Sequence, residues 1–121
     1  MTFETVRKLG LALPDVEEGA AYGSPALKVR GKLLACLAVH KSAEPGTLGV
    51  RIDYDQREGL LSEAPATYYL TDHYRNYPMV LVRLSQIEAD QLKDLLSASW
   101  RFVTAMKTKP RRPSRRGTAP L

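Results

Sequence analysis

Side chains suited to chemistry concentrate in one seven-residue segment, Asp-His-Tyr-Arg-Asn-Tyr-Pro at positions 72–78. Arg75 could pair with a phosphate, and Tyr74 or Tyr77 could stack on an exposed base. His73 could change charge near neutral pH. The alternative is a structural turn, in which the aspartate caps the loop and the tyrosines cover a sheet edge.

A second group of candidates is basic and surrounds a predicted hairpin turn. Lys28 and Arg30 share one face of an alternating segment, and Lys32 follows directly after Gly31. A charged hairpin tip of this kind could contact phosphates. The alternative is a solvated strand face, which is common in half-buried antiparallel sheets.

The remaining reactive side chains do not combine into a catalytic or metal site. Asp72 and His73 are sequence neighbours, and neighbours in an extended segment point to opposite faces. No serine lies in a nucleophile-elbow context. His40, His73 and the single cysteine, Cys36, lack the spacing of zinc ligands, and Cys36 lies in the most apolar segment, which is typical of an inert thiol. We therefore expect a non-enzymatic protein with no catalytic residue, metal or cofactor.

The charge of the chain is unevenly distributed. The 121 residues carry a net charge of +5, from 18 Lys and Arg against 13 Asp and Glu. Six of the basic residues and no acid fall in positions 107–121, so positions 1–106 have a net charge of −1. The segment 107–121 is proline-rich and lacks aromatics, which predicts a disordered tail that either attracts polyanions or only aids solubility. Its basic residues are Lys107, Lys109, Arg111, Arg112, Arg115 and Arg116.

Length and hydropathy limit the class of protein. A mass of 13.5 kDa is typical of one domain, which we place at residues 1–106. The longest apolar stretch, about Leu33–Val39, is far shorter than the roughly 20 residues that span a bilayer. The first residues show no secretory signal and one cysteine excludes an internal disulfide, so we expect a cytoplasmic protein without membrane attachment.

The periodicity of apolar residues predicts an α+β fold with helices packed on an antiparallel sheet, because hairpins link the strands and no βαβ alternation occurs. We predict an acidic turn at 15–19 and capping boxes at Asp55–Glu58 and Ser85–Glu88. The predicted helices cover 3–13, 55–64 and 85–106, and the predicted strands cover 20–23, 26–30, 32–40, 48–52, 67–71 and 79–84.

Two runs of residues carry a family resemblance, Tyr22–Leu33 and Thr71–Val82, together with the helix pattern that ends at Ser99-Trp100-Arg101. They resemble the MmcQ/YjbR family over residues 3–106. The resemblance implies a two-layer α/β fold with the order α-β(3)-α-β(2)-α. It also implies DNA binding, since family members are commonly described in this way.

Two functions remain open. The first is weak, largely non-specific DNA binding through phosphate contacts, assisted by the tail; it predicts that the hairpin and the aromatic segment share one positive face. The second is a protein-interaction or small-ligand-binding module, which predicts that aromatic residues converge on a concavity while the lysines diverge. The candidate DNA-binding residues are Lys28, Arg30, Lys32, His73, Tyr74, Arg75 and Tyr77, and the candidate pocket residues are Tyr22, His73, Tyr77 and Trp100.

Overall fold

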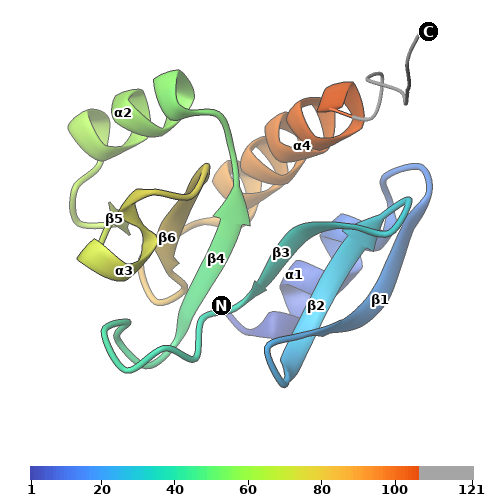
Figure 1. Ribbon diagram of the computed structural model, residues 1–121, viewed down its shortest axis with the longest axis horizontal. Coiled ribbons are helices and arrows are strands. Elements are labelled where there is room, and N and C mark those ends of the chain that lie inside the picture. The colour runs from blue at the N-terminus through green and yellow to red at the C-terminus, as the bar shows by residue number, and fades with distance from the viewer. Residues whose placement is uncertain (107–121) are drawn as a thin grey trace, which may run out of the picture.

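The computed structural model describes residues 1–106, which form one six-stranded sheet and four helices (Figure 1). All neighbouring strands are antiparallel, and their order across the sheet is β1-β2-β3-β4-β6-β5. The predicted α+β class with an antiparallel sheet is confirmed. The elements are α1 (Phe3–Leu11), β1 (Val16–Ala21), β2 (Ser24–Val29), β3 (Lys32–Leu37), β4 (Thr47–Arg51), α2 (Tyr54–Glu63), β5 (Tyr68–Tyr69), α3 (Asp72–Arg75), β6 (Met79–Arg83) and α4 (Ala89–Met106).

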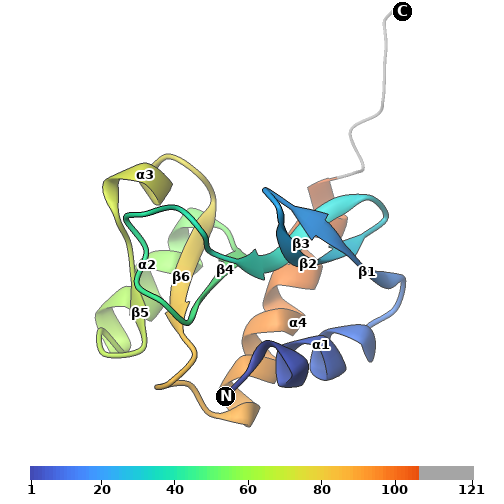
Figure 2. The same ribbon diagram turned by 90° about the horizontal axis from the view of Figure 1, so that it is seen from below.

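Helices α1 and α4 cover one face of the sheet, and α3 lies on the opposite side (Figure 2). The apolar stripe of α4, which includes Leu92, Leu96 and Val103, packs onto strand residues such as Leu34 and Val50. All five of these side chains are fully or almost fully buried. Burying this stripe supplies most of the stability of α4, because isolated helices of this length are marginal in water.

The sheet has a narrow joint at its centre. Strands β3 and β4 pair at only three positions, Ala35 with Val50, Cys36 with Gly49, and Leu37 with Leu48. The hairpins β1-β2-β3 lie on one side of this joint, and β4, β6 and β5 lie on the other (Figure 1).

The structure corrects the predicted acidic turn at 15–19. Strand β1 already begins at Val16, whose side chain is buried, and only Asp15 adopts the left-handed backbone of a turn, with φ of 63°. Glu17 and Glu18 are exposed on this outermost strand, where solvent-facing acids are well tolerated. The acidic composition therefore marks a sheet edge rather than a turn.

Both predicted capping boxes are displaced. Helix α2 is capped by Asp53 rather than Asp55, since its carboxylate accepts hydrogen bonds from the backbone N–H of Gln56 at 2.7 Å and from the Gln56 side chain at 2.7 Å. Helix α4 starts at Ala89 rather than at residue 85, and the side-chain oxygen of Gln91 accepts from the Glu88 N–H at 3.0 Å. In α2 the side chain of the N-cap residue satisfies an unpaired amide of the first turn, and in α4 a side chain of the first turn satisfies the amide of the residue just before the helix.

The predicted loop at 72–78 contains the short helix α3, and β5 is limited to two residues. Within residues 1–106, none of the helices combines the length and the apolar content needed to cross a bilayer. The basic tail predicted at 107–121 lies outside the described residues.

Candidate functional site

A cavity of about 460 Å³ opens on the face of the sheet opposite to α1 and α4. Side chains alternate along β4, so Leu48 and Val50 enter the core while Gly49 and Arg51 face the cavity. Strands β3, β4 and β6 form its floor, and the segments around α3 and the β1–β2 turn form its walls. The lining residues are Tyr22, Leu33, Cys36, Leu37, Ala38, Val39, His40, Gly49, Arg51, His73, Tyr74, Tyr77, Pro78 and Met79.

Gly49 keeps the floor of this pocket hollow. It pairs with Cys36 on one side and with Leu81 on the other, in the middle of the sheet. A Cβ atom at this position would lie 2.9 Å from Cε of Met79 and 3.6 Å from the carbonyl oxygen of Cys36. A side chain here would therefore occupy the space that the cavity now offers.

One wall is an aromatic cluster that joins α3 to the segment after β3. The rings of His40 and His73 stack with their centroids 3.5 Å apart and their planes within 6° of parallel. Tyr74 meets His73 edge-on at 4.8 Å, and Tyr77 lies tilted at 6.3 Å. Because the nitrogen lone pairs of stacked rings lie in parallel planes, the two histidines do not converge on one metal ion. Within residues 1–106 there is no group of three or more metal-ligating side chains.

The ring of His40 is held by its own loop. Its Nδ1 atom accepts the backbone N–H of Ser42 at 3.1 Å and lies 2.8 Å from the Ser42 hydroxyl, which in turn lies 2.8 Å from the Thr71 hydroxyl. Accepting an amide at Nδ1 places the proton of the neutral ring on Nε2. Burial, followed by the charges of His73 and Lys41, lowers the pKa of His40 below its ordinary value of 6.5.

Tyr22 forms the opposite wall from a strained position. It is 82% exposed, and with Gly23 it makes the two-residue turn between β1 and β2. Both residues have positive φ, 54° and 78°. This geometry is that of a type I′ hairpin turn, in which the first position favours asparagine, and a bulky side chain there is an outlier.

Buried Arg57 of α2 fixes the wall that carries α3, a role that is not predicted from the sequence. Its side chain is 7% exposed, and Nη1 donates to the backbone carbonyls of Arg75, Tyr77 and Met79 at 3.1, 2.9 and 3.4 Å. Its guanidinium also stacks over Tyr54 at 4.7 Å. An arginine on a short helix ordinarily indicates an exposed face, so the sequence carries no clear signal for this role.

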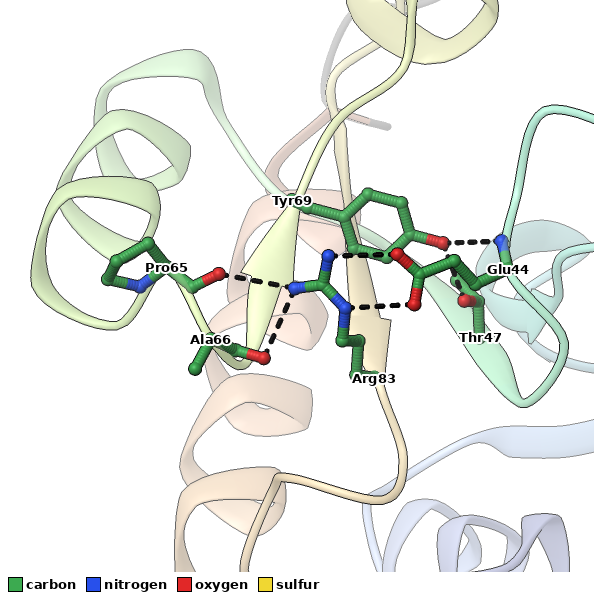
Figure 3. Close-up of polar contacts among 6 residues, drawn as sticks. All are labelled: Glu44, Thr47, Pro65, Ala66, Tyr69 and Arg83. Carbon is green, nitrogen blue, oxygen red and sulfur yellow. Dashed lines mark hydrogen bonds and ion pairs between the residues drawn. The ribbon is translucent and has the colours of Figure 1, made fainter.

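A second arginine supports the loop that carries His40 (Figure 3). Arg83 makes a two-pronged ion pair with Glu44 at 3.0 and 2.9 Å and donates to the carbonyls of Pro65 and Ala66. The guanidinium lies 4.2 Å from the ring centre of Tyr69, whose hydroxyl accepts the Glu44 N–H. The loop between β3 and β4 is thereby tied to β5 and β6.

The structure brings together three of the four predicted pocket residues, Tyr22, His73 and Tyr77. Trp100 is not part of the cavity. Its indole N–H donates to the carbonyl of Pro14 at 2.8 Å, and its ring packs against the core on the helix-covered face. The prediction that Trp100 belongs to the pocket is therefore wrong. The helical periodicity of α4 directs this side chain toward the segment after α1, on the face of the sheet opposite to the cavity.

The candidate DNA-binding residues do not form one surface. Lys28, Arg30 and Lys32 surround the β2–β3 turn, which lies at the opposite end of the molecule from α3 (Figures 1 and 2). Arg30 pairs with Asp15 at 3.0 Å, and Arg75 on α3 pairs with Asp72 at 3.5 Å. His73, Tyr74 and Tyr77 face the cavity instead of extending the basic hairpin.

Comparison with known proteins identifies a similar fold and a family to which the chain belongs. The fold is similar to that in the crystal structure of the Deinococcus radiodurans protein DR2400, described as a DUF419 domain, with a TM-score of 0.72 and 22% identity, covering 90% of this chain and 83% of that one. Over 54 residues the chain is 39% identical to uncharacterized proteins of Mycobacterium tuberculosis (Rv2570) and Mycobacterium bovis (Mb2600). That alignment spans 44% of this chain and 42% of each relative, so it covers less than half of their length. Residues 11–102 match the YjbR family, and the chain therefore belongs to that family.

Proposed function

We propose that this protein binds a small organic molecule in the pocket between Tyr22 and α3. One observation carries the proposal. Among residues 1–106 five large apolar side chains are exposed, and three of them, Tyr22 (82%), Val39 (59%) and Tyr77 (54%), border this one cavity. Single exposed apolar residues are ordinary, but a cluster around a concavity of a few hundred Å³ is typical of a ligand site.

The strain at Tyr22 supports the same proposal. A tyrosine with φ of 54° is less stable than glycine or asparagine at that position, and Tyr22 makes almost no packing contacts that would offset the cost. Because this tyrosine lowers stability and does not contribute to the core, its presence is best explained by a molecule that contacts its exposed ring. The ring lies on the rim of the cavity, where it can stack on a flat ligand.

The expected affinity is modest. A bicyclic aromatic compound of about 12 heavy atoms that gains about 0.4 kcal/mol per atom binds with about 5 kcal/mol, a Kd of roughly 0.2 mM. We propose binding without catalysis, because the residues that line the cavity include no carboxylate, lysine or serine that could act with the histidines, and burial raises the pKa of the Cys36 thiol.

DNA binding is the competing proposal. DNA binding would rely on the β2–β3 hairpin and on Arg75 of α3, which lie at opposite ends of the molecule. Arg30 of the hairpin is already paired with Asp15, and Arg75 is already paired with Asp72. The net charge of −1 over residues 1–106 gives this part of the chain little general attraction for a polyanion. The arrangement therefore favours the pocket over the hairpin.

The test is a titration of the full chain with 2-naphthylmethanol, a neutral bicyclic probe, followed by amide chemical shifts. We expect shifts confined to residues 22, 33, 36–40, 49–51 and 73–79, and their loss in the variant Gly49→Val, which fills the floor. Gly59→Ala is the matched control, because this glycine of α2 has open space around it and lies outside the cavity.

Scattered shifts, or equal binding by Gly49→Val and the wild type, would overturn the proposal. A parallel titration with a 20-base-pair duplex tests the competing proposal. Shifts at residues 28–32 and 75 on adding the duplex, without shifts from the naphthalene probe, would favour DNA binding.

A further inference from the structure

Arg51 stands at one end of the pocket floor. It lies two residues after Gly49 on β4 and faces the same side of the sheet, roughly 7 Å further along the strand. It pairs across the sheet with Met79, which also lines the cavity. The strand therefore fixes the position of a half-buried cation beside an apolar floor.

Within residues 1–106 the guanidinium of Arg51 has no acidic partner. Of the seven arginines in residues 1–106, five make ion pairs with carboxylates, and Arg51 and Arg101 do not. Arg101 is solvent-exposed on α4, whereas Arg51 is half-buried. Although the side chain lines the cavity, its guanidinium reaches the C-terminal end of α4, where Nη2 donates to Sδ of Met106 at 3.4 Å. A thioether is a weak acceptor, so an anion in the cavity can compete for this group.

The rest of the lining supplies no negative charge. Among the residues that line the cavity there is no aspartate or glutamate. The middle of the floor is apolar, with Cys36, Gly49 and Met79, and the far end holds the flat stack of His40 on His73. Burial raises the pKa of the Cys36 thiol, so this group stays neutral as well. With a cation at one end and stacked aromatic rings at the other, the cavity is suited to a ligand that carries a negative charge at one end and a flat ring system at the other.

We propose that the ligand class is a flat aromatic acid, whose carboxylate or phosphate pairs with Arg51 while its rings lie over Gly49 between Tyr22 and the His40–His73 stack. This inference rests on the proposed function. A planar guanidinium pairs with either anion through two parallel hydrogen bonds. Pairing in a half-buried site is stronger than at the surface, because less water screens the charges.

The experiment compares three probes that share one ring system: 2-naphthylmethanol, 2-naphthoate and 2-naphthyl phosphate. On the wild-type chain we expect one or both anions to bind at least tenfold more tightly than the alcohol, which equals about 1.4 kcal/mol. The relative affinity of the two anions shows whether the site prefers a carboxylate or a phosphate. The preference for the anions should weaken with added salt, while binding of the alcohol should not.

Arg51→Gln should abolish the preference for the anions over the alcohol, because it removes the charge and keeps a polar side chain at this position. Arg101→Gln is the matched control, since it removes one unpaired arginine outside the cavity. If Arg51→Gln fails to fold, Arg51→Lys serves instead, because it keeps the charge and should lose only part of the preference.

The outcomes separate the two proposals. If the alcohol binds in the pocket and the anions bind no better, the inference about Arg51 is wrong and the proposed function stands. If none of the probes shifts the pocket amides, the proposed function fails as well.

Discussion

Replacing Tyr22 by asparagine should make the protein more stable and its pocket weaker. Tyr22 holds a positive φ of 54° that asparagine adopts at much lower cost, which we put at about 1.5 kcal/mol of relieved strain. The side chain is 82% exposed, so the lost burial costs only about 0.5 kcal/mol. The net gain of about 1 kcal/mol should raise Tm by roughly 4–8 °C.

The same change should weaken binding of 2-naphthylmethanol about tenfold, because a stacked aromatic pair contributes about 1–1.5 kcal/mol. The assay pairs thermal unfolding by circular dichroism with an amide-shift titration. Arg30→Asn is the matched control: Arg30 and Gly31 form a turn of the same kind, with φ of 53° and 81°, at the other end of β2. It should gain somewhat less stability, since it loses an exposed ion pair with Asp15, and it should bind the probe normally. A Tyr22→Asn variant that is less stable than the wild type, or that binds the probe equally well, would refute the reasoning.

Two further predictions concern the groups that hold the pocket wall. Arg57→Met should lower the free energy of unfolding by about 2–4 kcal/mol in urea titrations, because it leaves the carbonyls of residues 75, 77 and 79 without the guanidinium donor. The control Arg101→Met should change the free energy of unfolding by less than about 0.5 kcal/mol. Equal effects of the two substitutions would show that the hydrogen bonds of Arg57 contribute little to stability. The lowered pKa of His40 means that the unfolded chain binds more protons than the folded chain between that pKa and 6.5. Stability should therefore be unaffected by His40 above pH 7 and should fall as the pH drops below 6.5. His40→Gln should reduce this decline in urea titrations between pH 8 and pH 5, and an unchanged decline would contradict the assignment.

The fold follows from local sequence patterns. The strict alternation around Lys28 and the apolar stripe of α4 define a strand face and a helix face without reference to the rest of the chain. The errors arise where tertiary contacts override local preference. Val16 joins the sheet because its side chain reaches the core, and Asp53 rather than Asp55 caps α2 because β4 ends at Arg51.

The aromatic residues on the rim of the pocket can be predicted from the sequence, but the residues of its floor cannot. Tyr22, His73 and Tyr77 are conspicuous by residue type, but residue type alone also groups Trp100 with them, although Trp100 lies outside the cavity. Gly49 and Arg51 become part of a site only through the pairing of β4 with β3 and β6, which joins residues far apart in the chain. Stacking of His40 on His73 likewise depends on the placement of two loops, and sequence spacing carries no information about it.

The three-residue joint between β3 and β4 runs beneath the pocket, so the two walls belong to different halves of the sheet. Tyr22 lies between β1 and β2 on one side, and His73 lies on α3, next to β6, on the other (Figure 1). A rotation of one half of the sheet against the other about this joint would change the distance between the two walls. A ligand that contacts both walls would therefore also hold the two halves of the sheet together, and tighter binding would stabilise the pairing of β3 with β4 by a correspondingly larger free energy.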